Sequence, residues 1–137
     1  GYDIGGQPSG YYTTAESIVE KMKQGDKGVI DYQAEPVMHQ LMGASDYGRY
    51  ADKTTGKMQL CLLTNNDITG GNSGSPLFDG QGRLIGLAFD GNWDSLASDI
   101  MFDKVLARTI SVDIRYVLYL MDRWGHADRL LQEIGAK

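Results

Sequence analysis

The chain has 137 residues, of which 42% are hydrophobic, a length typical of one domain with a moderate core. Its formal net charge is −5 at pH 7, so no basic stripe is available to neutralise phosphates, which argues against nucleic acid as the main partner. No apolar run approaches the roughly 18 residues that a membrane-spanning helix needs. The single cysteine, Cys61, cannot form an internal disulfide and lies in an apolar run, where we expect a small buried hydrophobic residue.

Two short helices are predicted in the first third of the chain. Residues 1–10 are rich in glycine, proline and serine and are expected to form a loop. Residues 14–23 combine a possible cap residue with apolar residues at helical spacing. Residues 36–42 begin with a proline, which suits the first turn of a helix. The polar stretch 46–56 is predicted to be a loop.

Strands are predicted in the middle of the chain, where the 18 glycines favour a turn-rich β architecture. Residues 57–64 form an apolar run typical of a strand. Residues 77–78 and 83–89 flank the turn sequence Asp-Gly-Gln-Gly and predict a β-hairpin. Residues 91–103 are expected to be irregular, and residues 108–112 predict a last strand.

Two helices are predicted near the C-terminal end of the chain. Residues 113–124 carry apolar side chains at helical spacing, and Gly125 follows as a stop signal. Residues 126–134 predict a second helix. The apolar positions of the two helices are Ile114, Val117, Leu118, Met121 and Trp124, then Leu130, Leu131 and Ile134. The predicted fold class is therefore mainly β with C-terminal helices.

The stretch Thr-Gly-Gly-Asn-Ser-Gly-Ser-Pro at residues 69–76 is the most informative motif. It contains Gly-x-Ser-Gly-x-Pro, the nucleophile turn of a trypsin-like serine peptidase, in which Ser73 is the candidate nucleophile. A serine hydroxyl needs a base to take its proton and donors to hold the oxyanion. The candidate oxyanion hole is the backbone N–H groups of Gly71 and Ser73. The alternative is an ordinary Gly/Ser-rich hairpin loop, although apolar runs flank the motif on both sides.

The histidine and aspartate that such a serine needs are harder to place. Both precede the serine in the trypsin-like order. His39, the only upstream histidine, lies on a short predicted helix where a surface or packing role is expected, and His126 lies at a helix terminus. Nothing singles out Asp67 as the acid that orients a histidine. We therefore expect the base and its acid on sequence outside this chain, in a first β-barrel, and this chain alone to be a poor catalyst or none.

Residues 89–93, Phe-Asp-Gly-Asn-Trp, and residues 108–116, Arg-Thr-Ile-Ser-Val-Asp-Ile-Arg-Tyr, are more particular than the serine turn. Together with that turn they resemble the C-terminal part of the bacterial dipeptidyl-peptidases of types seven and eleven. Further segments that match are 46–50, 82–88, 98–100 and, more loosely, 11–21. The resemblance covers nearly the whole chain.

The resemblance implies a serine exopeptidase with two β-barrels and a large helical insertion, exported to the periplasm or the cell surface. Such an enzyme removes dipeptides from peptides with a free N-terminus. Residues 1–137 would be a single-domain fragment, made of most of the second barrel plus the C-terminal helices, without the first barrel and the helical insertion. No cofactor or metal is implied, and homodimers are among the assemblies expected of the family.

The resemblance also assigns roles to particular residues. Ser73 matches the nucleophile, and Asp90 matches the acidic residue that binds the α-ammonium group of the substrate. Gly91 matches the position where the type that prefers acidic residues carries arginine. Gly91 supplies no cation and leaves space, so an apolar residue before the cleaved bond is expected, as in type seven. Without the resemblance, Asp90 would be interpreted as a turn cap. The aromatic residues Phe89 and Trp93 could help to shape nearby walls, although core packing is the main expectation for each.

Two other classes of function stay open. One is a trypsin-like endopeptidase of the glutamate-specific type, which would also cleave peptides with a blocked N-terminus. The other is a non-enzymatic binding or assembly module, in which Ser73 is only a turn residue. A nucleotide-binding loop is disfavoured because no Lys-Ser/Thr pair follows the glycines.

Overall fold

The computed structural model describes residues 10–97, 103 and 105–137. Their contacts group into two compact units, which are described separately. The sheet unit contains the described residues up to Thr13 and from Leu60 to Ile114, and the helical unit contains residues 14–59 and 115–137. Most of the predicted N-terminal loop and the segment 98–100 lie outside the described residues.

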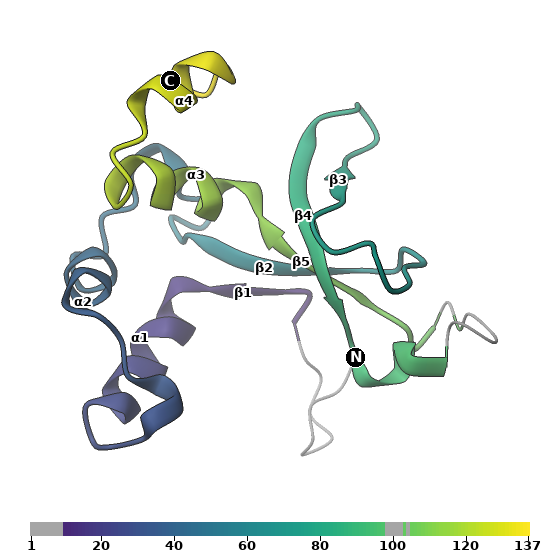
Figure 1. The fold of residues 1–137 in the computed structure, drawn as a ribbon, viewed down its shortest axis with the longest axis horizontal. Coiled ribbons are helices and arrows are strands. Elements are labelled where there is room, and N and C mark those ends of the chain that lie inside the picture. Colours follow the sequence, from purple (N-terminus) through teal and green to yellow (C-terminus); the bar gives the residue numbers. More distant parts are fainter. Residues whose placement is uncertain (1–9, 98–102, 104) are drawn as a thin grey trace. The chain divides into compact units, whose positions relative to one another are not determined.

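The sheet unit is built on an antiparallel five-stranded sheet with the strand order β1-β2-β5-β4-β3 (Figure 1). The strands are β1 (Tyr12–Thr14), β2 (Gln59–Thr64), β3 (Pro76–Phe78), β4 (Leu84–Gly91) and β5 (Thr109–Asp113). The predicted strand at 57–64, the hairpin and the last strand are confirmed, with bounds shifted by one or two residues. Strand β1 was missed because it has only three residues, of which the first two are exposed.

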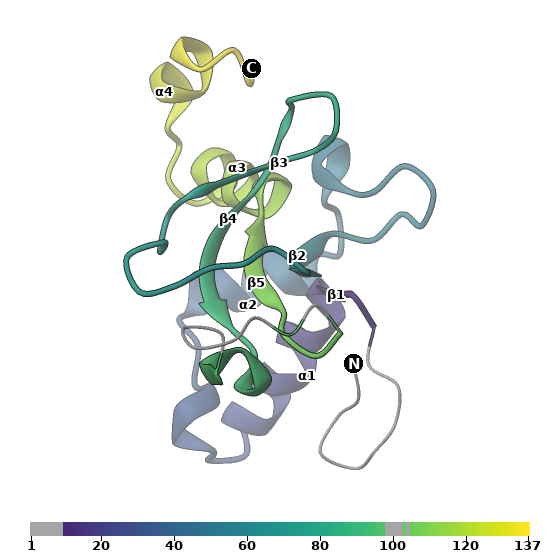
Figure 2. The same cartoon turned by 90° about the vertical axis from the view of Figure 1, so that its right-hand side faces the viewer.

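Strands β4 and β5 approach each other closely, as the elongated pair in Figure 2 shows. A Cβ atom added at Gly86 would lie 2.7 Å from the carbonyl oxygen of Val112, a distance that real side chains do not adopt. Further along β4 the register shifts between Ala88 and Asp90, which pair with Ser111 and Ile110, so one extra residue forms a β-bulge. A bulge turns the side chains that follow it to new directions.

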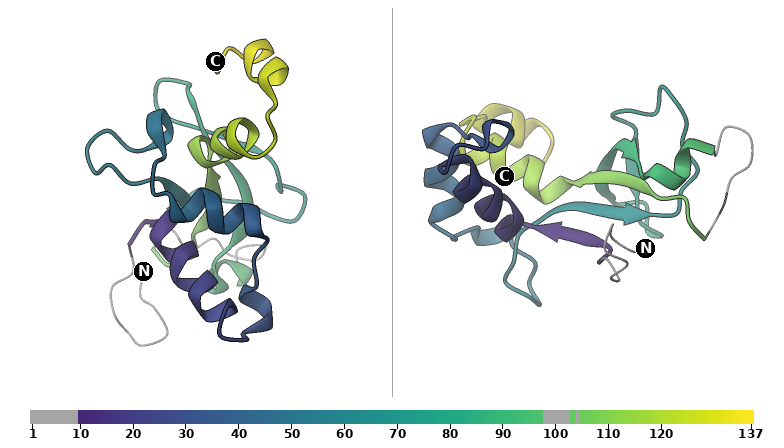
Figure 3. Two further views of the ribbon diagram at one scale, coloured as in Figure 1. Left: turned by 90° about the vertical axis from the view of Figure 1, so that its left-hand side faces the viewer. Right: turned by 90° about the horizontal axis from the view of Figure 1, so that it is seen from below.

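The helical unit contains the four predicted helices, all of which are confirmed. They are α1 (Ala15–Gly25), α2 (Pro36–Gly43), α3 (Ile114–Arg123, whose first residue belongs to the sheet unit) and α4 (Asp128–Glu133). Helices α1 and α2 contact each other (Figure 3). The predicted loop 46–56 includes the 3-10 helix η2 (Gly48–Tyr50). Within the described part of the chain, no helix combines the length and the apolar character needed to cross a bilayer.

Tyr119 is the most buried residue of α3, at 2% exposure, although it was not among the predicted apolar positions. Its ring makes edge-to-face contacts with Tyr47 and Tyr50, with 5.8 Å between ring centroids in each pair. Its hydroxyl donates to the Leu41 carbonyl at 3.1 Å, which allows a tyrosine to be buried without an unsatisfied polar group. In α4 Leu131 is buried and Leu130 is exposed, and Ile134, the residue that follows the helix, is also exposed.

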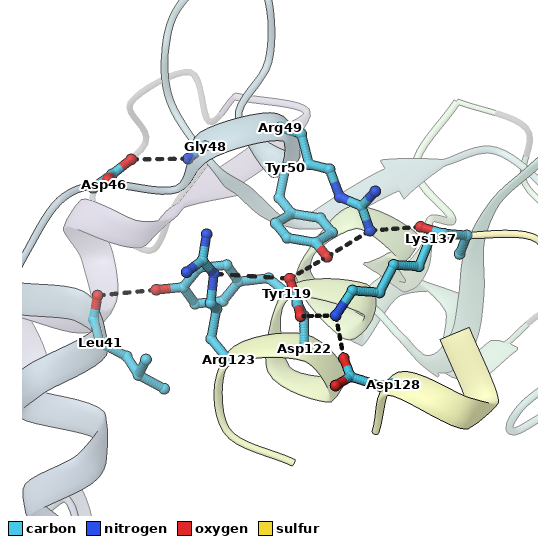
Figure 4. Close-up of polar contacts among 11 residues, drawn as sticks. Leu41, Asp46, Gly48, Arg49, Tyr50, Tyr119, Asp122, Arg123, Asp128 and Lys137 are labelled. Carbon is cyan, nitrogen blue, oxygen red and sulfur yellow. Dashed lines mark hydrogen bonds and ion pairs between the residues drawn. The ribbon is translucent and has the colours of Figure 1, made fainter. Parts of the chain in front are cut away.

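Asp122 of α3 accepts hydrogen bonds from Tyr50 and from Lys137, the last residue of this chain (Figure 4). The Tyr50 hydroxyl donates to its Oδ2 at 2.8 Å, and the Lys137 ammonium lies 3.4 Å from its Oδ1. Arg49 donates to the same tyrosine hydroxyl at 3.0 Å. The tyrosine hydrogen bond, ahead of the Lys137 ammonium, holds the pKa of the Asp122 carboxyl below its usual value. The ionised form is therefore stabilised by folding.

We expect the contribution of Asp122 to the stability of the helical unit to decrease at low pH. Because its pKa is lower in the folded state, its stabilisation is fully present above about pH 4, the ordinary value, and is lost as the pH falls through the lowered value. Asp122→Asn should therefore reduce hydrogen-exchange protection of the α3 amides at pH 7 and have little effect below the folded pKa. Asp31→Asn, at an exposed carboxylate of the same unit, is the control. An equal loss of protection at both pH values would contradict this role.

Candidate functional site

The serine motif folds as two consecutive turns. The N–H of Asn72 donates to the Thr69 carbonyl at 3.1 Å, and the N–H of Ser75 donates to the Asn72 carbonyl at 2.9 Å. The third residues of these turns, Gly71 and Gly74, have φ angles of 98° and 86°, as in type II turns, where a side chain would be strained. The Asn72 side chain closes the first turn further, since its Oδ1 accepts the Thr69 N–H at 2.8 Å. Gly71 and Gly74 are therefore conformational requirements of the motif.

Backbone hydrogen bonds join this loop to strand β4. The N–H of Gly74 donates to the Ala88 carbonyl at 2.7 Å, and the N–H of Ala88 donates to the Ser75 carbonyl at 2.9 Å. Ser73 directly precedes these anchored residues, at the second position of the second turn, and is exposed. The loop thus presents a serine hydroxyl to the surface from a backbone whose position is fixed by the sheet.

The two predicted oxyanion-hole donors are available. Among the described residues, the backbone N–H groups of Gly71 and Ser73 have no hydrogen-bond acceptor, and the Ser73 hydroxyl has no partner. Both residues are exposed. Backbone N–H groups held in place next to a hydroxyl are the chemistry that a tetrahedral oxyanion requires.

A pocket of about 220 Å³ opens beside Ser73 within the sheet unit. Three segments line it: the serine loop, the end of β4, and the 3-10 helix η3 (Trp93–Ala97). The lining residues are Ile68, Thr69, Gly70, Asn72 and Ser73, then Phe89, Asp90 and Gly91, then Ser95 and Leu96. The fold therefore brings three predicted site residues, Ser73, Asp90 and Gly91, to one pocket, and it places Gly71 in the adjoining loop.

The β-bulge explains how the end of β4 contributes to this pocket. Phe89 is the extra residue of the bulge and is 48% exposed, and Trp93 is 86% exposed. Their predicted core packing is therefore wrong, whereas the alternative that they shape nearby walls holds for Phe89, which lines the pocket. Asp90 is exposed and its Oδ1 accepts the Gly91 N–H at 2.8 Å. The hydrogen bond expected of a turn cap thus exists, on a carboxylate that also lines the pocket.

The space beside Gly91 is already occupied. A Cβ atom added there would lie 2.1 Å from the Oγ of Ser95 and 3.2 Å from its Cβ. The expectation that the glycine leaves space at this position is wrong, since a neighbouring side chain fills it. Ser95 was missed at the sequence level because nothing in its local pattern sets it apart from other loop serines.

Asn92 holds the segment that carries Ser95, and its role was also missed. Its backbone N–H donates to the Arg108 carbonyl at 2.9 Å, and its side-chain Oδ1 accepts the Arg108 N–H at 2.7 Å. Its Nδ2 donates to the Leu106 carbonyl at 2.8 Å and to Asp94 at 3.1 Å. This one side chain therefore connects both ends of the stretch between β4 and β5.

The other candidate groups have local roles of their own. His39, in the helical unit, lies with its Nε2 3.5 Å from Asp26 Oδ1, which fits the expected surface role. His126 follows α3 with a φ of 46°, so the left-handed residue at this helix end is the histidine rather than Gly125. Cys61 is half-buried, and burial raises the pKa of its thiol. A raised pKa disfavours the nucleophilic thiolate.

Comparison with known proteins shows which family this chain belongs to. A family model described as Peptidase S46 matches residues 1–136. Dipeptidyl-peptidase 7 of Porphyromonas gingivalis is 50% identical over 124 residues, which are 90% of this chain and 17% of that protein. The Asp/Glu-specific dipeptidyl-peptidase of the same organism is 39% identical over 125 residues, 91% of this chain and 17% of that protein.

A solved structure agrees with these sequence matches. The crystal structure of Porphyromonas endodontalis DPP11 in complex with substrate superposes with a TM-score of 0.85 at 36% identity, covering 94% of this chain and 18% of that chain. The present chain therefore spans less than a fifth of the length of these relatives. The antiparallel sheet and the C-terminal helices described above belong to the part that they share.

Proposed function

Because the chain belongs to the Peptidase S46 family, we propose that it carries the nucleophile of a serine dipeptidyl-peptidase that releases dipeptides from peptides with a free N-terminus. The observation that carries this proposal is the pocket that Ser73 shares with Asp90 and Gly91. A hydroxyl next to available N–H donors supplies the acyl-transfer part of the site, and the carboxylate supplies a cation-binding part.

The serine loop can perform acyl transfer in two balanced steps. The Ser73 Oγ attacks the carbonyl carbon of the second peptide bond while its proton passes to a base, which we assign to a part of the enzyme outside this chain. The Gly71 and Ser73 N–H groups hold the negative oxygen of the tetrahedral intermediate. The C–N bond then breaks, the leaving amine takes the proton, and water hydrolyses the acyl-enzyme to release the dipeptide.

The carboxylate of Asp90 explains why two residues would be removed at a time. An α-ammonium group that pairs with Asp90 fixes the N-terminus of the peptide at a set distance from the Ser73 hydroxyl. Peptides with a blocked N-terminus cannot form this charge-assisted hydrogen bond, so they would leave the Asp90 carboxylate without a cation and bind less tightly.

We propose that the residue before the cleaved bond is apolar. Side chains of Ile68, Phe89 and Leu96 line the pocket, and no lysine or arginine is among the lining residues that the structure describes. A substrate carboxylate buried there would have no cation to pair with, which is costly. The higher identity to dipeptidyl-peptidase 7 than to the Asp/Glu-specific relative from the same organism supports this preference.

For the architecture of the whole enzyme, we propose that this chain forms most of the second β-barrel of a trypsin-like double-barrel peptidase. The first barrel would supply the histidine and the aspartate, and residues 1–137 would form a single domain. We further propose a periplasmic or cell-surface location and peptide substrates, with homodimers as one expected assembly. These proposals rest on family resemblance.

The test of this function uses the full-length enzyme and one peptide in two forms. The peptide has an apolar second residue and carries either a free or an acetylated N-terminus, and the products are identified by mass spectrometry. We expect release of the N-terminal dipeptide from the free form only. Cleavage of both forms at an internal bond would support a trypsin-like endopeptidase, and no cleavage of either form would support a binding module.

A further inference from the structure

Residues 91 and 95 compete for one volume at the wall of the pocket. Both line the pocket, and a Cβ atom at residue 91 would meet the Ser95 hydroxyl oxygen at 2.1 Å. The φ angle of Gly91 lies outside the positive range, so its backbone would tolerate a side chain. The nearest obstacle after Ser95 is the Arg108 carbonyl oxygen at 3.7 Å, an ordinary contact. Among the residues that the structure describes, Ser95 is therefore the one that an added Cβ atom at this position would clash with.

The Ser95 side chain is fixed in this place by two hydrogen bonds. Its Oγ donates to the Asn92 carbonyl at 2.7 Å, and its backbone N–H donates to the same oxygen at 3.0 Å. Asn92 is in turn held by Arg108 and Leu106, which lie on the return path to β5. Rotation of the Ser95 hydroxyl would break its hydrogen bond and would still leave its Cβ 3.2 Å from the new atom.

We propose that Ser95 is a specificity-determining residue, whose side chain occupies the volume beside Gly91 and so sets the size of the pocket that receives the substrate side chain. This inference rests on the proposed dipeptidyl-peptidase function and goes beyond it. Residues 91 and 95 act as a pair, in which the smaller side chain at one position permits the larger side chain at the other. A substitution at residue 91 alone can therefore add a side chain only if Ser95 is displaced.

The proposal predicts how substitutions at residues 91 and 95 change the size of the second substrate residue that the pocket accepts. Ser95→Gly enlarges the pocket, so we expect kcat/KM for peptides with a bulky second residue, such as phenylalanine, to rise by roughly tenfold relative to peptides with alanine there. Gly91→Ala should lower kcat/KM for the bulky substrates by roughly tenfold or more, because the new methyl group forces the wall inward. The double variant Gly91→Ala/Ser95→Gly should recover most of this loss.

The experiment is a double-mutant cycle in the full-length enzyme, with kcat/KM measured for alanine, leucine and phenylalanine at the second substrate position. Gly80→Ala is the matched control, because nothing lies within 4 Å of the added Cβ atom there. The melting temperature of each variant is measured beside activity. We expect the effects of the two substitutions to be non-additive, both on kcat/KM and on the melting temperature. The preference for large over small substrate side chains should fall as the summed volume of the side chains at residues 91 and 95 rises.

Two results would overturn the proposal. If Gly91→Ala behaves like Gly80→Ala, the contact with Ser95 does not limit the pocket. If Ser95→Gly leaves the defect of Gly91→Ala unchanged, another group causes it. Failure of the proposed function is recognised separately, because the unsubstituted enzyme would then release no dipeptide, whereas coupling in the melting temperatures would still report the contact between residues 91 and 95.

Discussion

Replacing Ser73 by alanine in the full-length enzyme is expected to lower kcat by roughly 10⁴- to 10⁶-fold. The substitution removes the only atom of this chain that we assign to attack on the substrate carbonyl, and it leaves the two turns intact because their hydrogen bonds are made by Thr69, Asn72 and the backbone of Ser75. Substrate affinity should change little, because the oxyanion-hole donors and the pocket stay in place. The measurement is steady-state turnover of a peptide substrate with an apolar second residue and a free N-terminus.

The matched control for this prediction is Ser75→Ala. This serine belongs to the same loop, and it contacts Asn72 and Ala88 through backbone hydrogen bonds, which alanine preserves. We expect turnover within a few-fold of the unsubstituted enzyme. A fluorophosphonate probe followed by intact mass gives a second readout, with one adduct on the control and none on Ser73→Ala. Near-normal turnover of Ser73→Ala would remove this serine from the mechanism.

Asp90→Asn is expected to reduce kcat/KM for peptides with a free N-terminus by roughly 30-fold or more, the cost of removing one partner of a desolvated charge pair. The amide keeps the size of the side chain and an oxygen that can accept the Gly91 N–H, so the end of β4 should be preserved. Only the negative charge facing the pocket is lost. The measurement compares each peptide with an analogue whose α-amino group is replaced by hydrogen.

The analogue separates binding of the ammonium group from general damage. In the unsubstituted enzyme the analogue should be the much poorer substrate, and in Asp90→Asn the two should be cleaved at similar rates. Asp67→Asn, at an exposed carboxylate that is absent from the pocket lining, is the charge-matched control. If Asp90→Asn slows the peptide and its analogue by the same factor, Asp90 does not bind the ammonium group.

The sequence alone was sufficient for the parts of this protein that depend on local patterns. The apolar spacing of α3, the proline that opens α2 and the Asp-Gly-Gln-Gly turn of the hairpin each predict an element that the structure contains. The serine turn was predictable for the same reason, because Gly71 and Gly74 adopt backbone angles that other residues rarely adopt. A local steric requirement can be recognised from a short stretch of sequence.

The composition of the pocket wall depended on contacts that local patterns do not encode. The bulge that exposes Phe89 arises from the pairing of β4 with β5, and the volume beside Gly91 is filled by Ser95 only because Asn92 connects the intervening segment to Arg108. Likewise, the burial of Tyr119 follows from two aromatic rings and a carbonyl supplied by distant residues. The sequence thus determined which turn carries the serine, whereas the tertiary structure decided the shape of the pocket beside it, because close packing joins residues whose separation along the chain follows no period.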